Sequence, residues 1–584
     1  MSARHLVVGL DGADLRLIQQ LGAERLPHLH RLMANGVFAP LQSVRPPATL
    51  PNWATFLTGV DPGSHGVFDF TTRNGYRVQF SAGSVRATAT WIARLDQLGL
   101  QCACLFFPGT YPPERLQHGL YVSGWDAPVA FEADRSFVWP PDAYEQLRQR
   151  FGAQRFGDVD EFDTHTPGWH ERLPLALQRR VEQRTAMCEA LLAERAWDVF
   201  AVYFGESDTA AHHLWALHDP RSPRRPPAVS RGQEAGLSQV YMALDRALHS
   251  LWERAGASRC ELTVVSDHGF GGASDRVLYL NRALAEAGLL HFKRSGPLAP
   301  LAARALAARA KELALTRLPP WLRDRLFRLG STVLPSILES AARFGNIDMD
   351  RTRVFSDELN YFPALHLNLC GREPAGIVAP DEVEALVEQV RRVLLSLRDP
   401  ATGEAVVTAV HRREALFTGP CVARAPDLLL DLHLPGGYSY NLMPSAGAPA
   451  GAGPFRSLSL GEYLGRKGRS LQGSHREQGF YLAAGPSVAA RGEITAHIAD
   501  AAATVLARIG IAPDPAAAGQ VLPIAAAHPQ AAHATADPQT EANTLASSPA
   551  CPVLPAAPPV GPTTVSEQGE AKVAARLRRL GYIE

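Results

Sequence analysis

The sequence predicts an α/β protein in which helices cover both faces of a mainly parallel central sheet. Five short apolar runs are rich in β-branched or aromatic residues and have the length of strands buried on both faces; they begin at Leu6, Cys102, Trp197, Cys260 and Gly479. Amphipathic stretches lie between the runs, and the one that starts at Ser238 is typical of a helix. Strands that alternate with helices favour parallel pairing with right-handed crossovers.

The composition of the 584-residue chain indicates a globular protein without a bias towards charged partners. Aromatic residues make up 8% and charged residues 20%, and 58 Lys and Arg balance 58 Asp and Glu. The seven cysteines are scattered and form no CxxC pair, which fits a reducing compartment. No apolar run reaches the roughly 18 residues of a membrane span, and the start has no signal-peptide pattern. We expect a cytoplasmic protein with no nucleic-acid partner and no membrane span, and the oligomeric state stays open.

Three segments depart from the strand-helix pattern, and one large domain over residues 1–512 contains the first. The stretch 293–330 is rich in Ala, Leu and Arg, with nine basic and two acidic residues, and it predicts a helical insertion at about 290–350. Residues 513–564 turn to Ala, Pro, Thr and His, a composition that buries too little apolar surface to fold, so we expect a disordered linker. Residues 565–584 predict a short amphipathic helix.

Acidic and imidazole side chains recur directly after the predicted strands. They are Asp11, Asp208 with His212, Asp267 with His268, and His475. One such residue alone more simply caps a helix or lies hydrogen-bonded in the core, but a shared position at the carboxyl edge of a sheet favours a common ligand site. Three carboxylates and three imidazoles suit borderline divalent metals, with zinc the first candidate and manganese the second.

A hydroxyl candidate stands at the start of a predicted helix. Thr49 precedes a Leu-Pro-Asn turn and a helical pattern, which places its hydroxyl near a helix N-terminus with Pro51 in the first turn. Free backbone N–H groups and the helix dipole both favour negative charge there, so the position suits a phosphate or an alkoxide. From its position alone, an ordinary helix cap is the simpler interpretation of Thr49.

The ordered motifs identify a family resemblance over roughly residues 5–512. The series GLDG, PPATLPNWATFLTG, DPGSHGVFDF, ESDTAAHH, SDHGF and GSHREQG resembles the alkaline phosphatase superfamily, and within it the type I phosphodiesterase and nucleotide pyrophosphatase branch. Among these it is similar to bacterial proteins described as predicted phosphohydrolases or phosphomutases. Each motif alone is weak, but six in the family's order are specific.

The resemblance implies a catalytic domain with two divalent metals and a covalent phospho-threonine. Asp11, Asp267 and His268 would hold the metal that also binds the Thr49 oxygen. Asp208, His212 and His475 would hold the metal that faces the leaving group. Two such metals clamp the attacking and leaving oxygens of an in-line displacement. Asn52, near the nucleophile, would donate its amide to a phosphate oxygen.

Several neighbours of these motifs have simpler interpretations. Asp14 suits the first turn of a helix, and His65 suits a structural hydrogen bond. His213 adjoins His212, but the family has an apolar residue there, so it is left out of the site. Core packing is the simpler interpretation of three aromatic residues that could also stack on a substrate: Trp53, Tyr203 and Phe204.

The substrate expected from the resemblance is a small phosphate ester, first of all a phosphodiester or nucleotide pyrophosphate, with phosphonate esters as an extension. Arg45 keeps a phosphate monoesterase open, and the predicted insertion keeps a phosphomutase open. A sulfatase would need a Cys or Ser nucleophile in a C/S-x-P-x-R motif, which TLPNW does not supply. A non-catalytic scaffold that retains the fold is the remaining alternative, although no predicted ligand is missing.

Overall fold

The computed structural model describes residues 3–80, 83–124, 135–152, 164, 166–293, 343–358, 362–448, 451–465, 470–489, 491–514 and 516–524. The predicted helical insertion falls largely outside these ranges, as do residues 525–584 with most of the linker and the terminal helix. Those three features therefore stay predictions.

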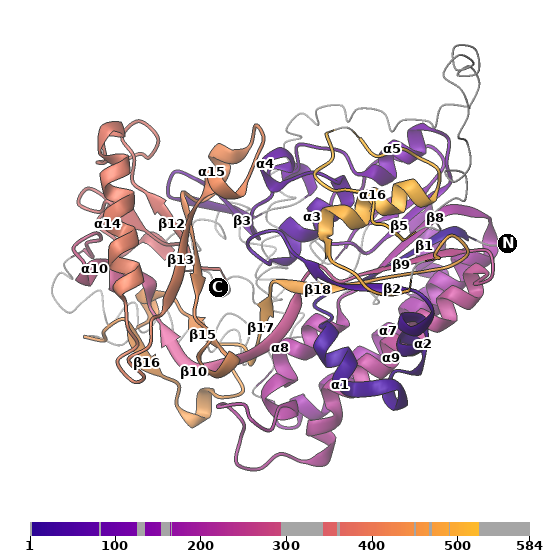
Figure 1. Ribbon diagram of the computed structural model, residues 1–584, viewed down its shortest axis with the longest axis horizontal. Helices are drawn as coiled ribbons and strands as arrows, with labels where there is room; N and C mark the ends of the chain where they lie inside the picture. The colour runs from indigo at the N-terminus through magenta and orange to yellow at the C-terminus, as the bar shows by residue number, and fades with distance from the viewer. Residues whose placement is uncertain are drawn as a thin grey trace, which may run out of the picture.

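A ten-stranded sheet forms the centre of the larger lobe (Figure 1). Its order is β19 (Gly492–Glu493), β2 (Val37–Gln42), β18 (Gln478–Ala484), β9 (Glu261–Val265), β1 (Ala3–Leu10), β8 (Trp197–Phe204), β5 (Cys102–Leu105), β6 (Leu120–Val122) and β7 (Val138–Trp139), and β20 (Ala496–His497) pairs with β2. The inner strands are parallel: β1 pairs in this way with β8 and β9, and β5 with β8 and β6. The α/β architecture and its mainly parallel sheet are thus as predicted.

Helices cover both faces of this sheet (Figure 1). One layer contains α1 (Leu15–Arg25), α2 (Pro27–Asn35), α7 (Trp169–Glu194), α8 (Glu206–His218) and α9 (Arg231–Ala255). The opposite layer contains α3 (Thr49–Thr58), α4 (Pro62–His65), α5 (Trp91–Gln97) and α16 (Ile498–Arg508), and α6 (Ala143–Phe151) contacts the β7 edge. Because both faces are covered, residues of β1 such as Val7 and Val8 are fully buried, as continuous apolar runs require.

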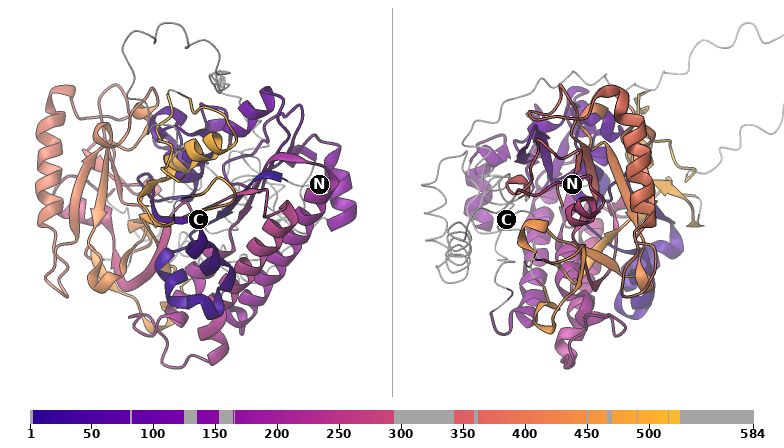
Figure 2. Two further views of the ribbon diagram at one scale, coloured as in Figure 1. Left: turned by 45° about the vertical axis from the view of Figure 1, so that its right-hand side comes forward. Right: turned by 90° about the vertical axis from the view of Figure 1, so that its left-hand side faces the viewer.

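A smaller lobe, visible beside the sheet in Figures 1 and 2, begins where β10 leaves the site. In one of its sheets β10 (Gly269–Leu278) pairs with β15 (Ser439–Leu442), β16 (Phe455–Ser457) and β17 (Gly473–Arg476); the other sheet contains β11 (Val354–Phe355), β12 (Ala364–Leu367), β14 (Leu428–Leu432) and β13 (Val407–Arg412). The helices α10 (Leu280–Glu286), α14 (Val383–Ser396) and α15 (Arg413–Leu416) and the hairpin β3 (Thr71–Asn74) and β4 (Arg77–Phe80) accompany these sheets. The lobe has its own hydrophobic core, which includes Leu284, Val354, Leu365 and Val390.

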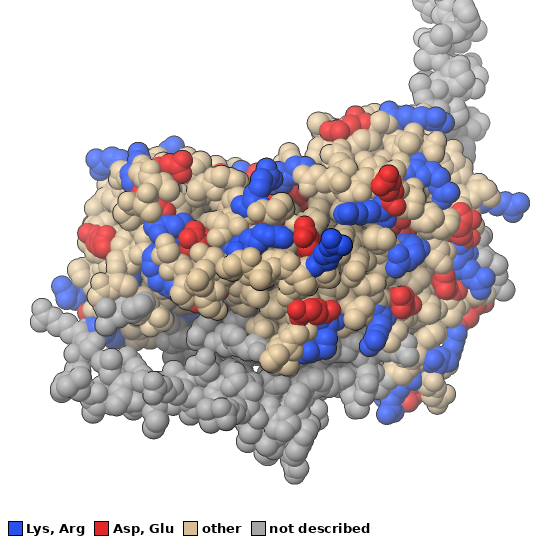
Figure 3. Space-filling model, turned by 90° about the horizontal axis from the view of Figure 1, so that it is seen from below, with Lys and Arg blue, Asp and Glu red and all other residues tan. Residues whose placement is uncertain are grey.

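Two further observations concern the limits of the main domain and its surface. Leu522 and Ile524 are buried in the core of the larger lobe, so the packed chain extends past residue 513, where the linker was predicted to begin. No helix among the described residues is long and apolar enough to cross a membrane. On the face drawn in Figure 3, basic and acidic side chains are interspersed.

Candidate metal centre and nucleophile

The six predicted ligands converge at one edge of the central sheet. Asp11 directly follows β1, Asp267 and His268 lie between β9 and β10, and Asp208 lies in the first turn of α8, which follows β8. His475 lies in β17, just before β18. Because β18 runs antiparallel to β9, its beginning lies at the edge where β9 ends. This arrangement brings residues from four parts of the chain into one buried cluster.

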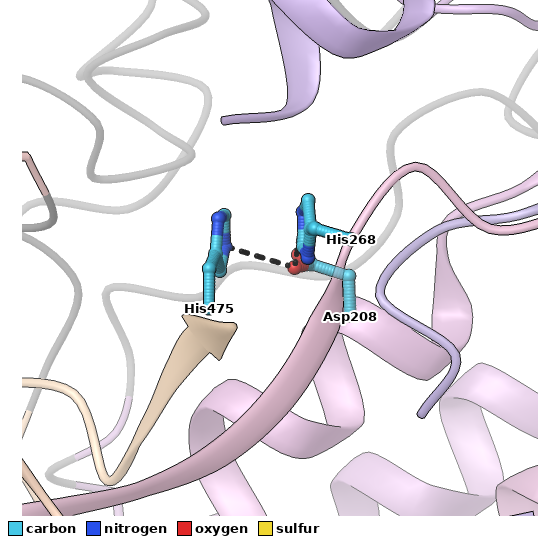
Figure 4. Close-up of side chains that lie close together, drawn as sticks. All are labelled: Asp208, His268 and His475. Carbon is cyan, nitrogen blue, oxygen red and sulfur yellow. Dashed lines mark ion pairs between the residues drawn. The ribbon is translucent and has the colours of Figure 1, made fainter. Parts of the chain in front are cut away.

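His268 lies at the centre of the cluster. Its Nε2 is 3.3 Å from Asp11 Oδ1, 3.4 Å from Asp267 Oδ2 and 4.0 Å from Asp208 Oδ1. Figure 4 shows its ring beside that of His475, and the ring centroids are 3.6 Å apart. Two groups have ligand atoms within 4.8 Å of one another: Asp11, Asp267 and His268 form one, and Asp208, His268 and His475 the other.

The first group is the predicted set, whereas the second contains His268 in place of His212. His212 nevertheless belongs to the same cluster. Its Nε2 lies 3.3 Å from Asp208 Oδ1 and 3.1 Å from His475 Nε2. The four-residue spacing of Asp208 and His212 on α8 brings both side chains to the site, as a single helical face requires.

Each imidazole is oriented by a backbone carbonyl on its other nitrogen. His212 Nδ1 lies 3.0 Å from the Gly473 oxygen, and His268 Nδ1 lies 3.1 Å from the Gly269 oxygen. His475 Nδ1 lies 2.9 Å from the Pro47 oxygen. Since a carbonyl only accepts, each Nδ1 carries a proton, and each Nε2 is directed into the cluster. Such a hydrogen bond on the other ring nitrogen commonly supports a metal-binding histidine.

Three carboxylate oxygens in the cluster are buried without a hydrogen-bond donor: Asp11 Oδ1, Asp208 Oδ1 and Asp267 Oδ2. Buried carboxylate oxygens are costly unless a donor or a cation compensates them. Each faces an imidazole Nε2 at 3.3 or 3.4 Å. The donor set of carboxylate oxygens and imidazole nitrogens therefore fits divalent metal ions, as the sequence indicated.

Mutual repulsion and burial shift the pKa values in the cluster in opposite directions. Burial and the Asp11 carboxylate raise the pKa of Asp267 well above its ordinary value. Burial lowers the pKa of His268, but the carboxylates of Asp267 and Asp11 outweigh burial and bring it to about 9. Burial and the neighbouring His268 lower the pKa of His475 to about 3. Negative charge thus concentrates around His268, where a cation would be stabilised.

Thr49 is the first residue of α3, after an N-cap at Ala48. Its hydroxyl is buried and lies 3.4 Å from His268 Nε2. The structure thus places the hydroxyl both beside the ligand shared by the two groups and at a positive helix end. The predicted position of Thr49, with Pro51 in the first turn, agrees with the observed helix.

The side-chain amide of Asn52 bonds to backbone groups and not to the candidate ligands. Its Oδ1 accepts the Val44 N–H at 2.7 Å, and its Nδ2 donates to the Ala48 and Pro46 carbonyls at 2.8 and 3.2 Å. Both ends of the amide therefore hold the loop that precedes α3. This geometry favours a positioning role over the expected contact with a phosphate oxygen.

Four residues near the motifs have mainly structural contacts, as the simpler interpretations predicted. Asp14 caps α1 through the Leu17 N–H, and His65 bonds to Thr55 and the Val67 N–H. Trp53 and Tyr203 are packed in the core, but their polar atoms donate to Asp11 Oδ2. These hydrogen bonds to Asp11 could not be predicted, because a buried aromatic residue gives the same sequence pattern with or without a polar contact.

The protein thus has an α/β fold, and a candidate metal centre lies at the carboxyl edge of its central sheet. Residues 5–322, more than half of the chain, match the family described as "Type I phosphodiesterase / nucleotide pyrophosphatase". The chain belongs to this family, whose members are phosphoric ester hydrolases and typically depend on divalent metals.

Individual relatives are distant. A segment of 118 residues is 29% identical to mouse ectonucleotide pyrophosphatase/phosphodiesterase family member 3, and it spans 18% of this chain and 13% of that protein. Murine ectonucleotide pyrophosphatase / phosphodiesterase 5, solved as an inactive variant with AMP, is 13% identical with a TM-score of 0.44, over 86% of this chain and 94% of the solved one. Phosphonoacetate hydrolase from Sinorhizobium meliloti 1021, solved with phosphonoformate, is 15% identical with a TM-score of 0.47, over 86% and 95%.

Proposed function

We propose that the protein is a phosphodiesterase or nucleotide pyrophosphatase that acts through a covalent phospho-threonine and two divalent metals. The observation that carries the proposal is the position of Thr49 Oγ1, at the N-terminus of α3 and 3.4 Å from the His268 imidazole at the centre of the cluster. When bound, the metals would neutralise charge on the attacking and leaving oxygens. Asp11, Asp267 and His268 would hold one, and Asp208, His212 and His475 the other. Zinc is the first candidate and manganese the second.

The steps assigned to the chain itself begin with Thr49. Its oxygen gives the hydroxyl proton to water and forms a bond to phosphorus while the bond from phosphorus to the leaving oxygen breaks, and the leaving group departs as an alcohol or phosphate after taking up a proton from water. The α3 N-terminus stabilises the negative charge on Thr49 Oγ and on the bound phosphoryl group. Water then cleaves the bond between Thr49 and phosphorus and regenerates the hydroxyl.

Arg45 bears on the choice between a diester and a monoester. A phosphate monoester carries a second negative charge and needs positive charge near the nucleophile to balance it. Arg45 could supply this charge, and it therefore keeps a monoesterase open. In the structure its guanidinium pairs with the carboxylates of Asp431 and Glu477. A guanidinium that already has two carboxylate partners contributes little positive charge to a substrate, which favours a singly charged diester.

The phosphomutase and scaffold alternatives differ in what supports them. The segment that would form a second substrate site falls outside the described residues, so no observation favours a mutase. A scaffold would tolerate the loss of ligands, whereas all six predicted ligands are present in this chain, and Thr49 lies beside one of them, His268. The cytoplasmic location of the protein stays a prediction.

Metal analysis combined with a substrate panel tests the proposal. We expect two divalent ions per chain and preferential turnover of chromogenic phosphodiesters over monoesters and sulfates, with phosphonate esters as possible additional substrates. Asp208→Asn should lose metal and activity together. The matched control, Asp381→Asn, changes an exposed carboxylate of the smaller lobe and should lose neither. Full activity in excess chelator would exclude the metal mechanism, and turnover of monoesters alone would exclude the diesterase.

A further inference from the structure

One carboxylate oxygen of Asp11 accepts hydrogen bonds from two aromatic residues. Asp11 Oδ2 accepts a hydrogen bond of 2.5 Å from the Tyr203 hydroxyl and one of 3.2 Å from the Trp53 indole Nε1. The other oxygen, Oδ1, accepts none and lies 3.3 Å from His268 Nε2. The two oxygens of this single carboxylate therefore have different surroundings: one bonds to neutral donors and the other faces the metal cluster.

The two donors come from different elements and both bond to the same oxygen of Asp11. Tyr203 lies on β8 opposite Gly9 of β1, two residues before Asp11. Trp53 lies on α3, one helical turn after Thr49. Both side chains are buried, and their rings pack edge to face with centroids 5.5 Å apart. Asp11 Oδ2 is thus a junction of the metal-binding strand, the neighbouring strand and the helix that begins at Thr49.

Gly9 provides the space that this junction requires. A Cβ atom at Gly9 would lie 2.8 Å from Trp53 Cη2 and 3.1 Å from Phe107 Cε1, closer than ordinary contacts. Glycine at this position lets the indole lie against β1, with its Nε1 within reach of Asp11. Here the indole N–H bonds to a carboxylate, as the polar atom of a buried tryptophan usually finds a partner.

We propose that Tyr203 and Trp53 are positioning residues, which hold Asp11 so that it offers Oδ1 alone to a divalent cation and which fix α3, with Thr49, to the same carboxylate. The proposal rests on the proposed function, because it assumes the metal set of Asp11, Asp267 and His268. Hydrogen bonds to the outer oxygen restrict the rotation of the carboxylate. The ordering of Asp11 is then built into the fold before any cation binds.

The Tyr203→Phe variant tests this proposal, because it removes one hydroxyl and keeps the ring. Stepwise titration of the metal-free protein with Co²⁺, followed by the visible absorption of the bound ion and by chelator competition, measures both sites without substrate. We expect one binding step to weaken by about 10- to 100-fold, the usual effect of losing a hydrogen bond to a metal ligand, while the other step changes little. Trp53→Phe should weaken the same step, with some additional loss of stability from the smaller ring.

Tyr121→Phe is the matched control. Tyr121 is equally buried, on β6, and its hydroxyl contacts no metal ligand among the described residues. Its Co²⁺ titration should match that of the wild type. Unchanged binding by Tyr203→Phe, or equal weakening of both steps, would overturn the proposal and leave Tyr203 a core residue. A wild-type protein that binds two ions but hydrolyses no ester would refute the proposed function alone.

Discussion

At the scale of single residues, Thr49 combines two sources of stabilisation for negative charge. Its hydroxyl lies at the N-terminus of α3 and beside His268, which belongs to both groups of ligand atoms. Neither feature alone distinguishes a nucleophile from a helix cap. Their coincidence at one buried oxygen is what gives the residue its proposed role.

We predict that Thr49→Ala lowers turnover of a chromogenic diester by several orders of magnitude, because the attacking oxygen is lost. Metal content and melting temperature should stay close to wild type, since the hydroxyl donates no bond that the fold requires. Thr49→Ser keeps the oxygen and should retain measurable activity. Steady-state kinetics with metal analysis of each variant checks both expectations. An alanine variant that works at the wild-type rate would show that water attacks phosphorus directly.

Asn52 gives a second prediction at this scale. Because its amide bonds to three backbone groups of residues 44–48, Asn52→Ala should lower the free energy of unfolding by roughly 1–3 kcal/mol, the usual cost of unsatisfied buried partners. Denaturant unfolding of the metal-free variant measures this loss. If Asn52 instead binds phosphate, its replacement would raise KM or lower kcat while the stability of the protein stays unchanged.

The sequence predicted that the acidic and imidazole residues would lie together, but not which residues support them. Asp11, Asp208 and Asp267 follow strands whose apolar runs are unmistakable, so their common edge follows from the topology. Tyr203 and Trp53 look like core residues in sequence, because nothing in the pattern shows where a ring's polar atom points. The amide of Asn52 likewise gives no sign of its backbone partners until the preceding loop has a conformation.

At the scale of elements, the strands of the larger lobe were predictable because they are buried on both faces. The direction of β18 was not, since an antiparallel strand has the same apolar run as a parallel one. The smaller lobe was also missed. Its strands are short, and β13 is half-exposed over most of its length, so its residues lack a continuous apolar pattern.

β18 pairs with β9 and passes close to the loop that contains His268, and Gly479 allows this close approach. A Cβ atom at Gly479 would lie 2.2 Å from the Ser266 oxygen and 3.0 Å from the His268 nitrogen, so β18 can approach the ligand-bearing loop only without a side chain there. We predict that Gly479→Ala lowers the free energy of unfolding by about 1–3 kcal/mol or more through overpacking, and weakens metal binding by displacing His268.

Thermal unfolding and Co²⁺ titration of the same preparation would measure both effects. Gly461→Ala is the control, because Gly461 has open space around a Cβ and no positive φ. Its stability should change by less than about 0.5 kcal/mol. If Gly479→Ala binds metal as the wild type does, the close approach of β18 is a packing feature without influence on the ligands.

At the scale of the whole molecule, the two lobes meet around the residues that precede and follow α3. Arg45 reaches Asp431 of the smaller lobe, and the Cys421 N–H donates to the Gly63 oxygen of α4 at 2.7 Å. Phe68 and Phe417 pack together in a small core between the lobes. The segments that flank α3 are therefore held by contacts with the smaller lobe, whereas the candidate ligands near Thr49 come mainly from the larger lobe.

His65 lies at this junction and makes it sensitive to acid. The ring is fully buried, its Nε2 donates to Thr55 Oγ1 at 3.0 Å and its Nδ1 accepts the Val67 N–H at 3.1 Å, which requires the neutral form. Burial, assisted by Arg86 and Arg424, lowers the pKa of His65 to about 3. Between this value and the ordinary value of 6.5, the unfolded chain binds a proton at His65 that the folded chain does not.

Stability must therefore fall as the pH drops below about 6.5, by up to about 1.4 kcal/mol per pH unit from this residue alone. We predict that His65→Gln is less stable than the wild type at pH 7.5, because it loses part of the bonding, but loses less further stability between pH 6.5 and pH 5. Denaturant unfolding of the metal-free proteins across this range measures the slopes. His118→Gln, which changes an exposed histidine, should keep the wild-type slope. Equal slopes for His65→Gln and the wild type would mean that the junction of the lobes opens enough for His65 to be protonated in the folded state.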